Sequence, residues 1–346
     1  MRVLWLFGNG LDISLGLKTS YYDFYQFLLT LEVKGLISEN NIIYKQLKHD
    51  FEHNKQDLWS DYELRLGNLT NQISEEDITR FTDDKIEIDL LLNDYLKSEE
   101  QKLNIDKDKV YEILTNSFSE IVNCSRRIDN DIVIKLIESN YNSNFYFKAI
   151  SFNYTKTVSL LWSEELKELK ELKELKNFRI KDYPNTDHSC LLENPFYLHG
   201  TLDDGEMIIG VNDTSQIINS NLKDNEELGD VLIKTNLLNN AGQLHFEEFC
   251  NNVKNSDIIC LYGLSVGKTD SCYWHFLKNR LVGTGAILII YHYRKDFKVN
   301  HITQKDRVIK EVKNNFYQNS NATDDEIRNI KNRIIVEINH QLFIDG

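Results

Sequence analysis

Short runs of consecutive apolar residues, rich in β-branched and aromatic side chains, constrain this sequence more than any other feature. Runs that are continuous rather than alternating predict strands that are covered on both faces. Segments of helical length separate most of the runs, and this alternation favours an α/β protein with an open, mostly parallel sheet. We expect the first strand to lie near the middle of that sheet. The predicted strands are residues 3–7, 145–152, 196–199, 207–211, 257–263, 286–293 and 333–339.

The longest interval between predicted strands is residues 20–144, where apolar residues recur at helical spacing. We interpret this interval as a helical insertion that covers one edge of the sheet as a cap. The α/β domain then consists of residues 1–19 and 145–346.

Residues 163–177 form a charged segment of Leu, Lys and Glu, which we interpret as a helical arm within the α/β domain. Its leucines follow a strict three-residue period, so that their stripe rotates around a helix of 3.6 residues per turn. The period favours a solvated arm, and a contact between copies of the chain is the alternative. The leucines lie at Leu166, Leu169, Leu172 and Leu175.

The chain is acidic, with 40 Lys and Arg against 54 Asp and Glu. This balance argues against a broad nucleic-acid-binding surface, which needs basic residues to meet phosphates. The five cysteines form no C-x-x-C pair, and their spacing indicates neither a zinc site nor a disulfide framework. Only five apolar residues separate Arg2 from Gly8, and no apolar stretch approaches the length of a membrane span. We expect a cytoplasmic protein with no membrane partner.

The first apolar run ends in Gly8-Asn9-Gly10, and Asp12 follows at the start of a predicted helix. A Gly-x-Gly turn after a strand allows backbone N–H groups to approach a phosphate or a ribose closely. The full G-x-G-x-x-G fingerprint is absent, because Ile13 stands where its third glycine would be. The alternative is structural: the glycines form the turn, and Asp12 caps the helix.

Several other apolar runs also end in small or polar residues. In Rossmann-like open sheets, ligands bind beyond the carboxyl ends of the strands, so we expect these residues to share one site. Any one of them alone is more often part of an ordinary loop. Besides the first turn, the residues are Asn153, Tyr154, Thr155, His199, Asn212, Asp213, Gly263, Ser265, Gly267 and Asp270.

Two titratable groups have competing interpretations. His199 lies between Leu198 and Gly200 and is either a general base or ribose contact, or a buried structural histidine. Glu63 belongs with Asp61 to the segment WSDYE in the predicted insertion, where solvated acids beside a packed Trp59 are the favoured interpretation and one acid facing the cleft is the alternative. A serine nucleophile elbow, a Walker loop and an H-E-x-x-H motif are all absent from the sequence.

Six motifs together resemble the AbiH family of bacterial phage abortive-infection proteins. The resemblance implies a role in phage defence, with activity after a phage-derived trigger is sensed, and leaves open whether the protein forms a homo-oligomer. The motifs, in chain order, are FGNGLDISLGLKTSYYDF, WSDYE, SFNYT, YLHG, IIGVND and YGLSVGKTDSCYW.

The sequence is also similar in plan to sirtuin-like NAD-cleaving domains of bacterial defence proteins. This resemblance implies that Asn153 holds the nicotinamide ribose and the attacking water, and that His199 contacts the ribose hydroxyls and acts as general base. Asn9 replaces the small residue usual in the first turn, and the zinc ribbon of protein-deacylating sirtuins is missing, which argues against deacylation. The remaining residues expected to bind the nucleotide are Gly8, Asn9, Gly10, Asp12, Tyr154, Gly263, Ser265 and Asp270.

Three hypotheses follow from the sequence. The first is hydrolysis of NAD or a related nucleotide at its N-glycosidic bond, with NAD as substrate and no metal. The second is a metal-dependent nuclease or phosphoesterase with Asp12, Asn153, His199 and Asp213 as ligands. The third is a module that binds a nucleotide without turnover.

Overall fold

The fold is built on an open, twisted sheet whose strands are parallel except at one edge. The computed structural model describes residues 1–53, 62–140, 144–162, 173–178, 188–203, 207–240, 245–297 and 301–344. In these residues the strands lie in the order β3-β4-β2-β1-β6-β7-β8, with β5 beside β2, and only the β3–β4 pair is antiparallel. The mostly parallel sheet and the central position of the first strand are therefore confirmed. The strands are β1 (Arg2–Phe7), β2 (Phe145–Ser151), β3 (Lys173–Phe178), β4 (His188–Leu192), β5 (Phe196–Tyr197), β6 (Ile258–Tyr262), β7 (Ile287–His292) and β8 (Ile334–Ile338).

Two sequence predictions of secondary structure are wrong in the described residues. Residues 207–211 form no strand of the sheet, because their backbone bonds outside it: Ile208 N–H donates to His199 C=O at 3.0 Å, and Val211 N–H donates to C=O of Leu232, the last residue of α9, at 2.7 Å. Residues 173–177 of the predicted helical arm belong to β3, where pairing with β4 satisfies the backbone groups that a helix would satisfy internally. Residues 163–172 of that arm lie outside the described residues.

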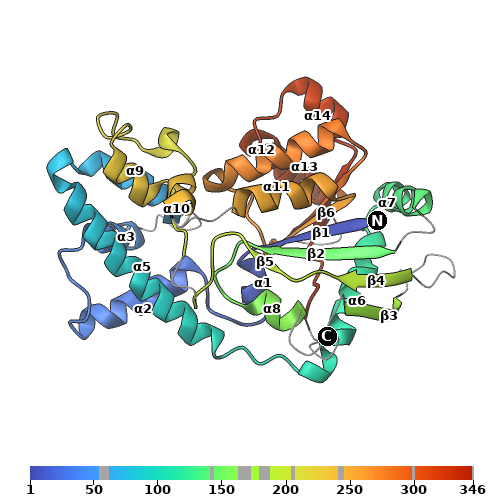
Figure 1. Cartoon of the computed structure of the whole chain (residues 1–346), viewed down its shortest axis with the longest axis horizontal. Helices are drawn as coiled ribbons and strands as arrows, with labels where there is room; N and C mark the ends of the chain where they lie inside the picture. Colours follow the sequence, from blue (N-terminus) through green and yellow to red (C-terminus); the bar gives the residue numbers. More distant parts are fainter. Residues whose placement is uncertain are drawn as a thin grey trace.

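Helices cover both faces of the sheet and extend beyond one end of it (Figure 1). Ser20 begins α2 by accepting a hydrogen bond from Asp23 N–H at 3.2 Å, and Asn41 begins α3 by accepting one from Tyr44 N–H at 2.9 Å. No helix among the described residues combines the length and apolar character that crossing a bilayer requires. The α-helices are α1 (Gly10–Ser14), α2 (Tyr21–Val33), α3 (Ile42–Glu52), α4 (Tyr62–Leu69), α5 (Ile78–Glu100), α6 (Lys107–Ser119), α7 (Arg127–Ser139), α8 (Thr157–Trp162), α9 (Glu226–Leu232), α10 (Lys234–Asn240), α11 (His245–Asn255), α12 (Ser271–Gly283), α13 (Ile302–Asn319) and α14 (Asp324–Ile330).

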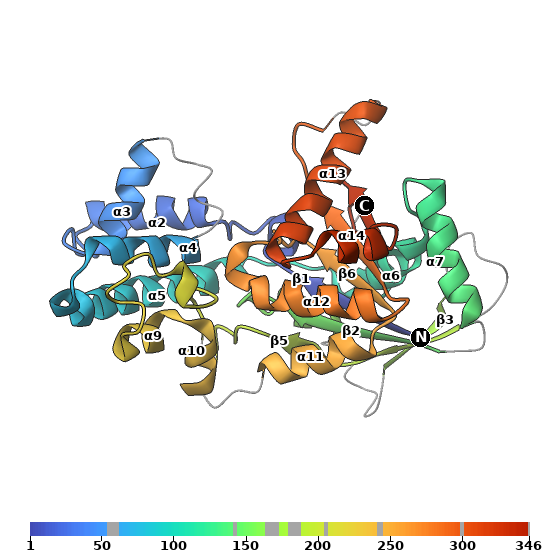
Figure 2. The same cartoon turned by 90° about the horizontal axis from the view of Figure 1, so that it is seen from above.

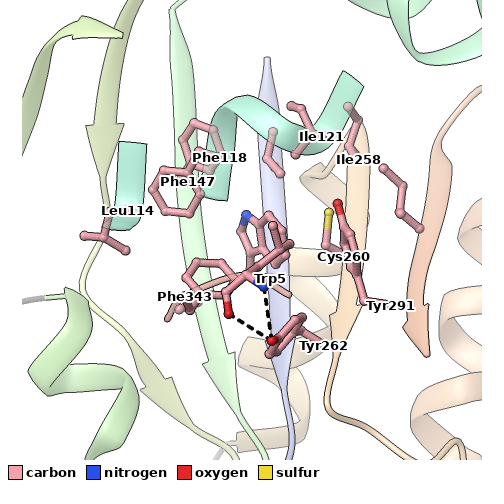
Figure 3. Packing of buried hydrophobic residues seen from close by; sticks show 14 of the residues in the cluster. Trp5, Leu114, Phe118, Ile121, Phe147, Ile258, Cys260, Tyr262, Tyr291 and Phe343 are labelled. Carbon is pink, nitrogen blue, oxygen red and sulfur yellow. Dashed lines mark hydrogen bonds between the residues drawn. The ribbon is translucent and has the colours of Figure 1, made fainter. Parts of the chain in front are cut away.

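Strand β1 supplies side chains to two separate cores. Trp5 points to the face covered by α6, α7 and α8, whereas Leu4 and Leu6 point to the face covered by α11–α14. On the first face, Trp5 packs edge-on against Phe343 with ring centroids 5.0 Å apart. Figure 3 shows Phe343 and Tyr262 together beneath Trp5, where the Tyr262 hydroxyl donates to Leu342 C=O at 2.9 Å. A segment far along the sequence thereby completes the core around the first strand.

A third core belongs to the cap that stands beyond the carboxyl ends of the strands, which Figure 2 shows beside the sheet. It combines α2–α5 with the segment that contains α9, so a later part of the chain also contributes to the cap. Helices α6 and α7 pack instead on the sheet face around Trp5. The predicted helical insertion 20–144 is therefore divided between the cap, which contains α2–α5, and the sheet face, which α6 and α7 cover.

Truncation of Phe343 tests the contribution of this late segment. Phe343→Ala should lower the free energy of unfolding by about 3–5 kcal/mol, because it removes a fully buried ring and leaves a cavity against Trp5. Tyr293→Ala is the control, since Tyr293 is 72% exposed and should contribute little. Urea denaturation followed by circular dichroism measures both variants, and equal stabilities of the two would contradict the packing described.

Candidate active site

The turns after β1 and β6 pack against each other, backbone to backbone. Gly8 N–H donates to Tyr262 C=O at 3.0 Å, and Gly10 N–H donates to Gly263 C=O at 2.9 Å. A Cβ atom on Gly10 would lie 2.5 Å from Gly263 Cα, closer than any real contact. Gly263 itself has φ +67°, a conformation that favours glycine. The glycines therefore allow the two turns to meet, and these two N–H groups are bonded within the protein.

Asn9, which the sequence predicts to bind a ligand, uses its side chain to hold a neighbouring loop. Its Nδ2 donates to Thr19 C=O at 2.8 Å, and its Oδ1 accepts from the Thr19 hydroxyl at 2.5 Å. This reciprocal pair fixes the segment between α1 and α2. Asn9 thus connects the turn of β1 to the start of the cap.

A cavity of about 440 Å³ lies between these turns, the end of β2 and the cap. The parallel strands from β4 to β8 follow the order of a doubly wound sheet, in which the chain departs in opposite directions from β1 and β6. Ligands of such sheets bind at this switch point, beyond the carboxyl ends of the strands. Of the ten residues predicted to be catalytic or to bind the nucleotide, Gly10 alone is not part of the cavity wall. The nine that line it are Gly8, Asn9, Asp12, Asn153, Tyr154, His199, Gly263, Ser265 and Asp270.

Asp12 is almost fully buried on the wall of the cavity, with 1% of its surface exposed. Its Oδ2 accepts a hydrogen bond from the Thr155 hydroxyl at 2.6 Å, whereas its Oδ1 has no partner. Burial raises the pKa of Asp12 to about 6, against the opposing effects of Thr155, Thr157 and Asn153. The Asn153 amide lies near this carboxylate, but its Nδ2 has no hydrogen-bond partner either.

His199 also lines the cavity, with its ring packed edge-on against Phe152 at 5.5 Å between centroids. Burial, assisted by the charge of Lys234, lowers the pKa of His199 to about 3, so the imidazole is neutral at physiological pH. A hydrogen bond with the Phe152 backbone opposes this shift, and Nε2 has no partner. The ring is therefore packed like a structural histidine on one side and borders the cavity on the other.

A buried cation that the sequence analysis did not identify joins the cap to the sheet. Lys234 Nζ donates to Glu63 Oε2 at 2.8 Å and to Asp270 Oδ1 at 2.7 Å, and only 4% of the lysine side chain is exposed. The same Asp270 oxygen lies 3.6 Å from His199 Nε2. Glu63 comes from α4 in the cap, whereas Asp270 follows β6, so Lys234 holds the two sides of the cavity together.

Glu63 is buried on the cavity wall, so the favoured interpretation as a solvated acid is wrong and the alternative, an acid that faces the cleft, holds for it. Burial raises the pKa of Glu63 to about 7, although Lys234 and Thr269 favour its charged form. Burial alone would also raise the pKa of Asp270, but Lys234 and His199 outweigh it, and the net shift is downward. Asp270 is thus the permanent anion of the network. Trp59 and Asp61, the neighbours of Glu63 in the sequence, lie outside the described residues.

The comparison with known families can now be set beside this geometry. The family described as Bacteriophage abortive infection AbiH matches residues 4–293, which include most of β1, the cap and every residue of the cavity. This chain belongs to the AbiH family. No curated protein sequence matches it. Membership makes the chain a phage abortive-infection defence protein, and all six sequence motifs fall within the matched region of this AbiH protein.

Asn212 and Asp213 of the AbiH chain lie outside the cavity wall. Asp213 is one of the four ligands in the metal-dependent hypothesis. Asn212 Oδ1 accepts from Cys272 N–H at 3.1 Å, and Asp213 Oδ1 accepts from Ser215 N–H at 2.8 Å. Both side chains therefore stabilise local turns. Asp213 is not brought together with Asp12 and His199. Within the described residues, no three His, Cys, Asp or Glu side chains form a group suited to a metal ion.

The contact between the two glycine turns predicts a large effect of a small substitution. Gly10→Ala should destabilise the AbiH protein by about 1–3 kcal/mol, because the new methyl group collides with the Gly263 backbone. Gly283→Ala provides the control: it lies at the end of α12, where an added Cβ meets nothing within 4 Å. Chemical denaturation of both variants measures the difference, and a Gly10→Ala protein as stable as wild type would contradict the close approach.

Removal of Lys234 should be costly for a different reason. Lys234→Met should lower the free energy of unfolding by about 3–5 kcal/mol, since it leaves the Asp270 charge buried without its cation. Lys48→Met removes a comparable ion pair, 2.6 Å long to Glu32, from a surface where water replaces it. Little change is expected for Lys48→Met. If Lys234→Met were equally harmless in denaturant titrations, the buried network would not hold the cap.

Proposed function

We propose that this AbiH protein defends the cell by hydrolysing NAD or a related nucleotide at the N-glycosidic bond. One observation carries the proposal: four buried side chains around the cavity each have a polar atom without a hydrogen-bond partner, namely Asp12, Tyr62, Asn153 and His199. Buried polar groups without partners are costly, and they mark sites where a ligand or ordered water supplies the missing bonds. Their concentration at the switch point of a doubly wound sheet favours a nucleotide as that ligand.

Hydrolysis of this bond passes through a ribose that carries positive charge, as in other glycoside cleavages. The Asn153 amide is suited to hold the ribose and the attacking water, since its Nδ2 is available. The neutral His199 ring is suited to accept a hydrogen bond from a ribose hydroxyl through Nε2. The Asp12 carboxylate favours the positive charge that develops, and nicotinamide departs as a neutral molecule.

The cap side of the cavity supports recognition of a flat ring. Tyr21 and Tyr62 have ring centroids 5.1 Å apart, and both line the cavity together with Tyr22 at its rim. Aromatic side chains bind nucleobases by stacking and supply little sequence or base discrimination by themselves. The Tyr62 hydroxyl, which has no partner, adds one hydrogen bond that a nucleobase or an amide can satisfy.

Loss of the two central polar groups tests the proposal. Purified Asn153→Ala and His199→Ala proteins should release nicotinamide from NAD at least about 100-fold more slowly than wild type, because each lacks a contact to the ribose or the water. Asn212→Ala is the matched control, since this asparagine lies outside the cavity wall. Mass spectrometry of the products, with and without a chelator, measures the rates, and plaque assays measure protection.

Three outcomes distinguish the hypotheses. Nicotinamide release that Asn153→Ala abolishes and Asn212→Ala retains supports hydrolysis. Calorimetric binding of NAD with no product over hours supports a binding module instead. Nucleic-acid or phosphoester cleavage that a chelator prevents supports the metal-dependent alternative, and either of the last two results rejects the proposal.

A further inference from the structure

One oxygen of the Asp12 carboxylate is hydrogen-bonded, and the other has no hydrogen-bond partner. Oδ2 is held by the Thr155 hydroxyl at 2.6 Å, and Thr155 in turn lies within 3.3 Å of the Thr157 hydroxyl. Oδ1 has no partner, although the side chain is 99% shielded from solvent and lines the cavity beside Asn153. The Thr155 hydrogen bond fixes the orientation of the carboxylate, and it leaves one buried oxygen without a partner on a residue that lines the cavity.

We propose that Asp12 is the catalytic base, which removes a proton from the water that attacks the ribose; this role rests on the proposed hydrolysis. The water oxygen forms a bond to C1′ of the ribose while the bond from C1′ to the nicotinamide nitrogen breaks. The electron pair of the broken bond stays on that nitrogen. One proton of the water passes to Asp12 Oδ1 and is released to solvent after the product leaves, so NAD and water yield ADP-ribose, nicotinamide and a proton.

His199 is the other group to which a base role can be assigned, and its surroundings suit it less. A base is most effective when its pKa lies near the pH at which it works. Burial raises the pKa of Asp12 to about 6, whereas burial and Lys234 lower that of His199 to about 3. His199 is therefore a neutral hydrogen-bonding group, and Asp12 is an anion close to its titration point.

Few other charges face Asp12. Glu100 from α5 raises its pKa by repulsion, and the Tyr197 phenol from β5 lies near enough to be affected by the Asp12 charge. The remaining neighbours are the Thr155, Thr157 and Asn153 side chains, which favour the ionised form. The proton affinity of Asp12 is consequently set by burial against three uncharged polar side chains, of which Thr155 donates a hydrogen bond to it.

The test compares Asp12→Asn with Thr155→Val in the full-length protein, with NAD as the substrate. Asn keeps the shape of Asp12 and can still accept the Thr155 hydrogen bond, so the fold should be retained, as thermal melting verifies. Asp12→Asn should bind NAD in calorimetry but lower kcat at least about 100-fold. Activity of wild type should fall as pH drops through about 6, because Asp12 becomes protonated there. This decrease of activity at low pH, the acid limb of the pH profile, should be absent from the residual activity of Asp12→Asn.

Thr155→Val provides a readout that a merely structural role of Asp12 would not change. It removes a hydrogen bond that favours the ionised carboxylate, so the acid limb of kcat/KM should move to higher pH. Two results would reject Asp12 as the base and leave the proposed hydrolysis intact, provided that wild type is active. One is an Asp12→Asn protein that retains kcat, and the other is a decrease of kcat/KM at low pH that Thr155→Val does not shift. If wild type releases no nicotinamide at any pH, the proposed function itself fails.

Discussion

The close approach of two turns is the contact on which the rest of this structure depends. The turn after β1 meets the turn after β6 without side chains between them, and Gly8, Gly10 and Gly263 make this possible. The contact brings the carboxyl ends of adjacent parallel strands together, so that Asp12 and Ser265 border one cavity. The same backbone groups that bind phosphate in other doubly wound proteins here bind each other. The N–H groups of Gly8 and Gly10 are thereby occupied within the protein.

The buried side chains around the cavity lack hydrogen-bond partners that polar groups in a protein interior usually have. Asp12, Asn153 and His199 come from three different segments, and each leaves a polar atom without a partner, a cost that packing elsewhere must offset. The Lys234 network shows the opposite arrangement, in which a buried cation has an anion from each side of the cavity. The charges around Lys234 are thus paired with each other, whereas Asp12, Asn153 and His199 have polar atoms without hydrogen-bond partners.

The sequence predicted the central strands because their signal is local. Buried parallel strands such as β1 and β6 are continuous apolar runs, and their carboxyl ends are recognisable without any partner. The residues 173–178 were missed because their strand exists through pairing with β4, which a leucine period cannot reveal. Lys234 was missed because a lysine at the end of an apolar run is ordinarily exposed, and only the fold brings Glu63 and Asp270 to it.

The central position of β1 has a consequence for synthesis of the protein. Its parallel neighbours begin at Phe145 and Ile258, so an apolar strand at the start of the chain has no partner until residue 145 is made and lacks its second partner until most of the sequence exists. At about 5–20 residues per second, translation leaves it exposed for roughly ten seconds or more. Such a segment is a natural target for chaperones and for aggregation. The cavity, which needs both neighbours, also cannot form on a nascent chain that lacks β6.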